Sequence, residues 1–329
     1  MNVVRDGDPK FMSIVVPCYN EEESVGPFFE RLSQVCGEMN MPFECIFVDD
    51  GSADRTLPRL KELHFQYPEN VRFIELSRNF GKEAALLAGL RAARGNLVAV
   101  MDADLQDPPD LLPKMVSLID EGYDSVGTRR VDRAGEPPIR SYFARRFYIW
   151  MNRVSHVKLV DGARDFRLMT RQVVDSVLSL SEYNRFSKGL FSWVGYKTAY
   201  VEFENVERQH GTTKWNFWGL FRYSIDGFVN FSSFPLQLSV IAGLVISFAA
   251  FVSVIIVVIR ALLMDYDTPG WASLLSVVLF LGGIQMLSIG VLGEYLGKLF
   301  LETKHRPVYL VRNSSDSPAT KSSTLTIRR

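Results

Sequence analysis

Short apolar runs alternate with longer amphipathic stretches in the N-terminal part of the chain. The apolar runs are Ser13 to Cys18, Cys45 to Asp49, Val71 to Leu76 and Leu97 to Asp102, and the stretches with helical spacing are Glu22 to Met39, Asp54 to Gln66 and Lys82 to Ala93. Unbroken apolar runs are typical of strands buried on both faces, and helical crossovers place such strands in parallel. The pattern predicts an α/β doubly wound sheet, in which ligands bind at the carboxyl ends of the strands.

Two longer apolar segments follow, Pro235 to Ile259 and Thr268 to Gly293, and neither contains Asp, Glu, Lys or Arg. About 20 apolar residues are needed to cross the hydrocarbon core of a bilayer, so both segments predict transmembrane helices. A pair of buried core helices is the alternative. Such helices seldom run so far without a charge.

The side of the membrane is predicted from the basic residues. The connector Arg260 to Gly270 has one basic residue and two acidic ones, whereas Lys298, Lys304, Arg306 and Arg312 follow the second segment. The positive-inside rule therefore predicts both flanks in the cytosol, and the start of the chain has no stretch that suits a signal peptide. The aromatic-rich stretch Trp215 to Phe231 predicts a helix in the membrane interface, with an ordinary amphipathic core helix as the alternative.

These patterns predict four parts. They are a cytosolic α/β domain over residues 1–212, an interfacial amphipathic helix over 213–231, a two-helix transmembrane domain over 232–300 and a partly disordered cytosolic tail over 301–329. Disorder is expected in the Ser/Thr-rich end from Ser314 onwards. A hydrophobic content of 47% excludes a disordered chain as a whole.

Charge and cysteine content narrow the function classes. Because 37 basic residues balance 37 acidic ones, the chain lacks the net basic character of a nucleic-acid binder. Cys18, Cys36 and Cys45 are odd in number and have no metal-ligand spacing, which predicts reduced, buried thiols. Neither Gly-x-Gly-x-x-Gly nor a Walker motif occurs, so the sheet is not predicted to bind a dinucleotide or to carry a P-loop.

Acidic residues gather instead where the predicted strands end. They are Glu21 and Glu22 with Asn20 after the first strand, Asp49 and Asp50 after the second, and Asp102 and Asp104 after the fourth. One such cluster is usually a solvated turn or a helix cap, which is all that we expect of Asp54. Asp102, Asp104 and Gln106 alternate, so their oxygens can converge on Mg²⁺ or Mn²⁺, with a polar strand exit as the alternative.

Four motifs lie at these strand ends. They are PCYNEEES (Pro17 to Ser24), VDDGSADRT (Val48 to Thr56), SRNFGKEAAL (Ser77 to Leu86) and DADLQDPP (Asp102 to Pro109). With the two membrane helices and GEYLGKLF (Gly293 to Phe300), they resemble the polyprenyl-phosphate glycosyltransferases of glycosyltransferase family 2. The match is to the bactoprenol glucosyltransferase branch, is similar also to dolichol-phosphate mannose synthases, and covers nearly the whole chain. It implies a GT-A catalytic domain that moves a sugar from a nucleotide diphosphate, with inversion, to the phosphate of a prenyl carrier.

The resemblance also implies site residues. The donor-binding set is Pro17, Tyr19, Glu21, Asp49, Asp50, Lys82 and Asp102; the metal ligands are Asp102, Asp104 and Gln106; Arg129 and Arg140 are the candidates for the lipid phosphate; and Arg208 and Lys214 belong to a loop that closes on the diphosphate. Arginine suits a phosphate because its planar fork can form two bonds to it. A surface charge is the alternative for either of the two arginines.

The segment DGARDFRLMTR (Asp161 to Arg171) resembles the acceptor-side motif of the same family, which implies catalytic-site roles for Asp165 and Arg167. A phosphate monoester has a second pKa near 6, so the acceptor is mostly a dianion at neutral pH and needs little help from a base. Asp165 is thus either a general base or a group that orients a sugar hydroxyl or the arginines. A helix cap or a salt bridge is the structural alternative.

The implied reaction is transfer of glucose from UDP-glucose to undecaprenyl phosphate at the cytosolic face of the bacterial plasma membrane, with N-acetylglucosamine, a modified arabinose or mannose as alternative sugars. A processive polysaccharide synthase is disfavoured because the chain lacks a Gln-x-x-Arg-Trp motif and further membrane helices. A membrane-anchored nucleotide-sugar sensor is the non-enzymatic alternative. A homo-oligomer is expected from small-residue faces at Gly282, Gly283, Gly290, Gly293 and Gly297.

Overall fold

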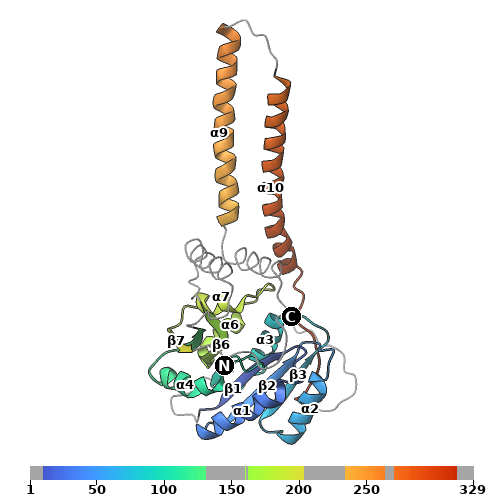
Figure 1. Ribbon diagram of the computed structural model, residues 1–329, viewed down its shortest axis with the longest axis vertical. Coiled ribbons are helices and arrows are strands. Elements are labelled where there is room, and N and C mark those ends of the chain that lie inside the picture. Colours follow the sequence, from blue (N-terminus) through green and yellow to red (C-terminus); the bar gives the residue numbers. More distant parts are fainter. Residues whose placement is uncertain (1–9, 131–159, 161, 204–233, 264–269, 317–329) are drawn as a thin grey trace. The chain divides into compact units, whose positions relative to one another are not determined.

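The computed structural model describes residues 10–130, 160, 162–203, 234–263 and 270–316 (Figure 1). The chain divides into two compact units. The first contains the mixed sheet with its helices and the C-terminal strand, and the second contains two long helices.

The first unit contains eight strands in one sheet. The strands are β1 (Met12–Cys18), β2 (Phe43–Asp49), β3 (Val71–Leu76), β4 (Leu97–Val100), β5 (Ser125–Arg130), β6 (Ala163–Thr170), β7 (Thr198–Phe203) and β8 (Val311–Ser314). The helices are α1 (Val25–Glu38), α2 (Thr56–Gln66), α3 (Lys82–Ala92), α4 (Leu112–Asp120), α6 (Arg171–Ser179) and α7 (Ser187–Trp193), with a 3₁₀ turn at Pro109–Leu111.

The strand order is β7-β5-β6-β4-β1-β2-β3-β8. β1, β2, β3 and β4 run parallel, as the crossover pattern predicts. β6 pairs antiparallel with both β4 and β5, so β5 points in the same direction as β4. The carboxyl ends of β1 to β5 therefore meet at one edge of the sheet, called the catalytic edge below.

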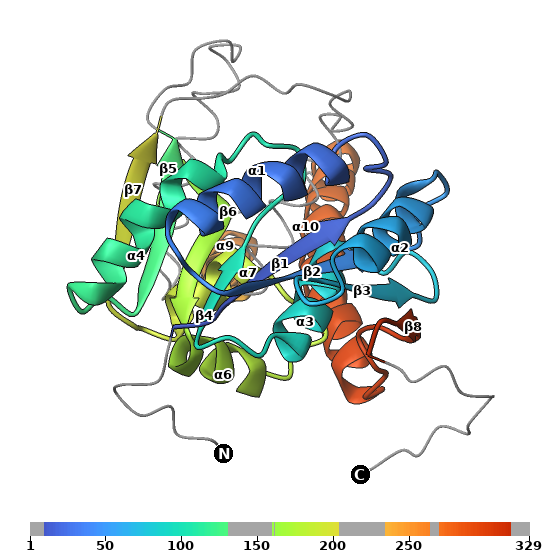
Figure 2. The same cartoon turned by 90° about the horizontal axis from the view of Figure 1, so that it is seen from below.

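Helices cover both faces of the sheet (Figure 2). Alternate strand residues build the two cores: Ile14 and Val16 pack towards α1, α2 and α4, whereas Val15 packs towards α3, α6 and α7. Burial of β1 and β2 on both faces explains why their sequences are apolar without alternation.

Strand β8 is an element that the sequence pattern did not indicate. It pairs antiparallel with β3, so the chain after the long helices adds the outermost strand to the sheet. Ser315 and Asp316 continue this contact, since Phe73 N donates to Ser315 Oγ and Arg72 pairs with Asp316. These residues lie in the segment for which composition alone predicted disorder, and their contacts with β3 hold them in place.

The second unit consists of α9 (Phe234–Leu263) and α10 (Trp271–Thr303), which contact each other (Figure 1). Within them, Phe234–Ser253 and Ser276–Thr303 have mean hydropathies of 2.1 and 1.9 and are not buried, so both are long and apolar enough to cross a membrane. The predicted interfacial helix lies outside the described residues. A Cβ at any of the five α10 glycines would meet nothing within 4 Å, and the homo-oligomer stays a prediction.

Candidate active site

The catalytic edge brings together residues that are far apart in the sequence. Val100 of β4 pairs with Arg167 of β6 in antiparallel register, so Asp102 and Asp165 both lie just beyond that pair at the same edge. Lys82 is the first residue of α3, the helix that follows β3, and so it starts from this edge as well. The sheet topology thus places two carboxylates and one ammonium group together.

Lys82 joins the two acids directly. Its Nζ donates to Asp102 Oδ2 at 2.8 Å and to Asp165 Oδ2 at 2.5 Å. Lys188 of α7 approaches Asp165 from the other side, with its Nζ 3.5 Å from Oδ1. The side chains of Lys82, Asp102, Asp165 and Lys188 are 42%, 26%, 28% and 32% exposed, so an anionic substrate can reach this cluster.

The electrostatics of the cluster favour its charged forms. Partial removal from water opposes ionisation of Asp165, but the positive charges of Lys82 and Lys188 outweigh it and hold the pKa of this carboxyl well below its ordinary value. In the same way, the attraction of Asp102 and Asp165 overcomes desolvation and raises the pKa of Lys82. Asp165 is a stable carboxylate and Lys82 a stable ammonium.

Arg164 organises the loop that follows β4. Its Nε donates to Asp107 Oδ1 at 3.0 Å, and its Nη2 donates to Gln106 Oε1 at 3.2 Å. Asp107 is 1% exposed, and burial raises its pKa to about 6. Leu105 in this loop has a φ of +57°, a backbone conformation that is costly for a branched side chain. The Arg164 bonds, together with the 3.1 Å bond from Gln106 N to Asp104 Oδ1, stabilise the turn enough to hold Leu105 in this conformation.

Asp50, one of the predicted donor-binding residues, supports the backbone of the site. It is 3% exposed and accepts hydrogen bonds from Phe80 N at 2.7 Å and Gly81 N at 2.8 Å. This fixes the turn before Lys82. Burial raises the pKa of Asp50 although these two bonds oppose the shift.

The other predicted donor-binding residues surround the ends of β1 and β2. Asp49 is 2% exposed, and burial raises its pKa, whereas Tyr19 is 43% exposed. Glu21 accepts from Ser24 Oγ at 2.9 Å at the start of α1. Pro17 pairs in register with Val48. These positions lie at the same edge as Lys82, and their contact with a nucleoside stays a prediction.

Two predicted arginines have different surroundings. Arg129 lies at the carboxyl end of β5, is 44% exposed and pairs with Glu202 at 3.6 Å. Arg167 is 4% exposed; it donates to Ser125 Oγ at 3.0 Å and its guanidinium stacks 5.1 Å from the ring centre of Phe191. Arg129 can reach a ligand at the edge, whereas Arg167 holds β5, β6 and α7 together beneath it.

Arg140, Arg208 and Lys214 lie outside the described residues. Sequence reasoning missed Glu83, Arg164 and Lys188. Arg164 and Glu83 stand inside motifs already singled out, next to Asp165 and Lys82, whereas Lys188 has no local signal because only the packing of α7 brings it to the edge.

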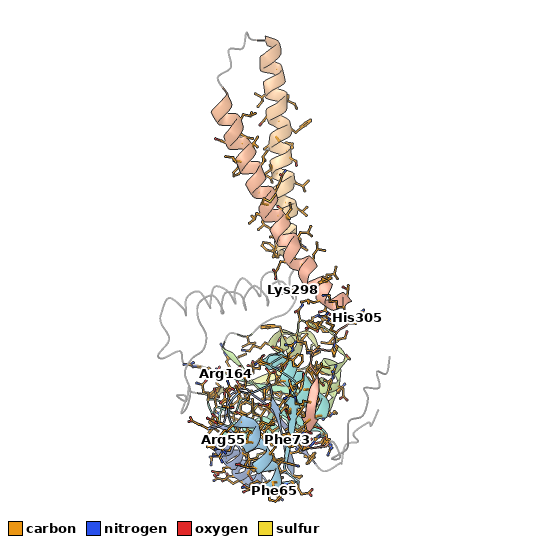
Figure 3. The ribbon with its side chains drawn as sticks, turned by 90° about the vertical axis from the view of Figure 1, so that its right-hand side faces the viewer. Arg55, Phe65, Phe73, Arg164, Lys298 and His305 are labelled. Atoms are coloured by element: carbon orange, nitrogen blue, oxygen red, sulfur yellow. The ribbon has the colours of Figure 1, made fainter. Side chains whose placement is uncertain are left out.

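The residues at the edge fit a hard divalent cation. Asp102, Asp104 and Gln106 offer oxygen donors, and the buried Oδ2 of Asp107 has no hydrogen-bond partner. Within the described ranges, no group of three His, Cys, Asp or Glu side chains is arranged to hold a metal, and the predicted set differs in that its third member is the amide oxygen of Gln106. Figure 3 shows Arg164 well above Phe65 of α2, which lies at the lower end of the domain.

The chain is similar in sequence to known proteins over most of its length. Residues 13–178 match glycosyl transferase family 2. The chain is 43% identical to an uncharacterized glycosyltransferase of Synechocystis, covering 91% of this chain and 94% of the relative, and 38% identical to the bactoprenol glucosyl transferase of Shigella phage SfV, covering 92% and 98%. A solved structure, glucosyl-3-phosphoglycerate synthase from Mycobacterium tuberculosis, is similar with a TM-score of 0.44 and 19% identity over 66% of this chain and 76% of that one.

The match of half the chain to one family, and the high identity over nearly the full length of both relatives, exceed what a shared sheet topology alone would produce. The chain therefore belongs to glycosyl transferase family 2 and is a glycosyltransferase close to the bactoprenol glucosyl transferases.

Proposed function

We propose that the protein transfers glucose from UDP-glucose to undecaprenyl phosphate at the cytosolic face of the bacterial plasma membrane, with inversion at the anomeric carbon. The observation that carries the proposal is the cluster of Asp102, Lys82 and Asp165 at the catalytic edge of a chain with two membrane-length helices. The similarity to the phage relative, a bactoprenol glucosyl transferase, supports the choice of acceptor and sugar.

The reaction is an in-line displacement. A phosphate oxygen of the lipid attacks the anomeric carbon, the bond from that carbon to the diphosphate breaks, and UDP leaves with the bonding electrons. Lys82 and Arg129 supply positive charge at the edge where the diphosphate and the lipid phosphate must lie. Because the acceptor is mostly a dianion at neutral pH, no proton has to be removed before attack.

Asp165 is suited to orientation rather than to proton transfer. Lys82 and Lys188 hold its pKa low, so Asp165 is too weak a base to accept a proton at neutral pH. Asp102, Asp104 and Gln106 would hold Mg²⁺ or Mn²⁺, which neutralises charge on the diphosphate when bound. Arg164 orients Gln106 within this set.

The test is transfer of labelled sugar to undecaprenyl phosphate by the detergent-purified protein. UDP-glucose, UDP-N-acetylglucosamine, a UDP-linked modified arabinose and GDP-mannose serve as donors, with Mg²⁺ or Mn²⁺ and with chelator. We expect lipid-extractable label from UDP-glucose that chelator abolishes. Label from a different donor would show that another sugar is transferred in place of glucose. No label from any donor would refute transfer to undecaprenyl phosphate.

The variant Asp104→Ala tests whether the predicted metal ligands are needed for transfer. It removes one predicted metal ligand at the end of the sheet while leaving the Lys82 bonds to Asp102 and Asp165 intact. Transfer should fall by about 100-fold or more if a charge-stabilising cation is lost. Parent-like transfer by Asp104→Ala would show that the residue is not needed for the reaction.

A further inference from the structure

The Asp165 carboxylate is contacted on both of its oxygens. Lys82 donates to Oδ2 at 2.5 Å, and Lys188 lies 3.5 Å from Oδ1. Two cations, one on each oxygen, restrict rotation of a carboxylate more than a single cation does. A single cation leaves the second oxygen free to move. The pair of lysines therefore determines how Asp165 is presented at the catalytic edge.

Lys188 reaches this position because of the way α7 is anchored. Its ammonium also donates to Ala163 O at 3.3 Å, two residues before Asp165 on β6. The preceding residue, Ser187, donates through its N to both carboxylate oxygens of Glu83, at 3.1 and 3.0 Å, and its hydroxyl bonds the same carboxylate. The start of α7 is thereby tied to the start of α3.

Glu83 and Lys82 are consecutive residues of α3 with complementary tasks. Lys82 contacts Asp165 directly, whereas Glu83 holds the backbone from which Lys188 extends. Glu83 is buried enough that its pKa is raised by desolvation, and its bonds with Ser187 oppose that rise. One turn of α3 thus locates both cations that contact Asp165.

We propose that Lys188 is a positioning residue for sugar transfer. Together with Lys82 it holds Asp165 as an oriented carboxylate, and Glu83 places Lys188 by anchoring α7. This inference rests on the proposed function, and it assigns to Lys188 and Glu83 a role that neither the family motifs nor the local sequence indicated. A carboxylate bound on both oxygens orients its neighbours and does not act as a base.

The test compares Lys188→Met, Lys188→Arg, Asp165→Asn and the double variant Lys188→Met with Asp165→Asn. Displacement of a catalytic group by about 1 Å can cost about 100-fold in rate, so Lys188→Met should lower kcat by about 10- to 100-fold. The KM for UDP-glucose should stay near that of the parent because Lys82 still faces the donor. Lys188→Arg should recover most of kcat, since a cation returns to the same position.

The double variant distinguishes positioning of Asp165 from an independent role. Once Asp165 has lost its charge, removal of Lys188 should cost little more, so the two effects on kcat should be strongly non-additive. Lys197→Met is the matched control, because Lys197 follows α7 in the chain but its ammonium lies over the Tyr123 ring, 4.3 Å from the ring centre. This control should keep the parent kcat.

Parent-like kcat in Lys188→Met, or effects that multiply in the double variant, would overturn the proposal. If the parent transfers no sugar, the proposed function fails by itself. The same four variants then decide the arrangement through their free energies of unfolding: coupling between positions 165 and 188 supports the paired contact, and additive changes refute it.

Discussion

Gly51 shows how one residue without a side chain shapes the donor side of the site. It has a φ of +68°, and a Cβ there would lie 2.6 Å from both Arg78 C and Asn79 N. Those atoms belong to backbone, which cannot move aside as a flexible side chain can. The turn after Asp50 therefore approaches the segment before α3 more closely than any other residue would allow.

Gly51→Ala should destabilise the protein by about 2–4 kcal/mol, because it adds a backbone clash to the cost of a positive φ. Gly122→Ala is the matched control: its φ is +88°, but a Cβ there meets nothing within 4 Å. It should cost only about 1 kcal/mol. Denaturant unfolding measures both, and equal losses would show that the close approach at Gly51 is unimportant.

The three cysteines are free and buried, as their number and spacing predicted. Burial raises the pKa of Cys36 to about 12 and raises those of Cys18 and Cys45 as well. The thiolate is the reactive form, so a buried thiol with a raised pKa reacts slowly.

At pH 8 the folded protein should react with a thiol reagent at least about 100-fold more slowly than the unfolded chain, since both the raised pKa and burial suppress attack. Absorbance of the released chromophore measures the rate, with the denaturant-unfolded protein as reference. Rapid labelling of the folded protein would contradict the burial of these residues.

Strand β8 attaches the C-terminal segment to the sheet through charge as well as through backbone pairing. Arg72 is 8% exposed and binds both Glu44, which is 2% exposed, and Asp316. The hydrogen bond from Arg72 lowers the pKa of Asp316. Tyr309 adds an apolar contact to the core beside α3, and its ring lies 5.6 Å from the Arg91 guanidinium.

Asp316→Asn should lower the free energy of unfolding by about 1 kcal/mol at pH 7, the upper range for a partly exposed pair. Because the folded-state pKa of Asp316 is lowered, its contribution is present above the ordinary aspartate value of about 3.9 and is lost as the pH falls through the folded-state pKa. The gap between the parent and the variant should therefore shrink below about pH 4. Asp175→Asn, at a carboxylate that is 63% exposed, is the control. A gap that does not vary with pH would contradict the Arg72 contact.

Helix α7 is too short to be stable alone, and tertiary contacts determine its position. Isolated helices of this length are marginal in water. Glu83 at its start, Phe191 in the core beside α3 and α6, and the stacking of Arg167 on Phe191 hold it against the sheet. Helical spacing alone does not predict such a short element, so the local sequence does not indicate that Lys188 lies at the catalytic edge.

The pairing of β8 with β3 constrains the topology of the whole chain. β3 precedes α9 and β8 follows α10, yet both strands belong to one sheet. If α9 and α10 each cross the membrane, the two crossings put Gly270, at the start of α10, on the side opposite to both strands. The charge distribution predicts the same topology by an independent route.

Single reporter cysteines test this arrangement, because the native thiols are buried. Gly270→Cys, at the start of α10, should be labelled by a membrane-impermeant reagent from outside intact cells. Ser314→Cys on β8 should be labelled only after the membrane is opened. Labelling of both positions from the same side would exclude the two-crossing topology.

Local pattern was sufficient for the features that depend on near neighbours in the chain. Short unbroken apolar runs predicted β1 to β4, and helical spacing predicted α1 to α3 to within a few residues. Long segments without a charged residue predicted α9 and α10. The acids at the strand ends could be placed at one edge because parallel strands end together. The motifs there contain Asp102 and Lys82, and the resemblance of the segment from Asp161 to Arg171 singled out Asp165; the structure shows that Lys82 contacts both carboxylates, and the roles of the three side chains in transfer stay predictions.

Only the tertiary structure decided what depends on register between distant segments. The antiparallel pairing of β6 with β4 puts Asp165 beside Lys82, the anchoring of α7 by Glu83 brings Lys188 to Asp165, and the return of β8 closes the edge at β3. Such pairings are selected by the summed packing and hydrogen bonding of the folded sheet. A window of sequence does not contain that sum, because its terms come from residues tens to hundreds of positions apart.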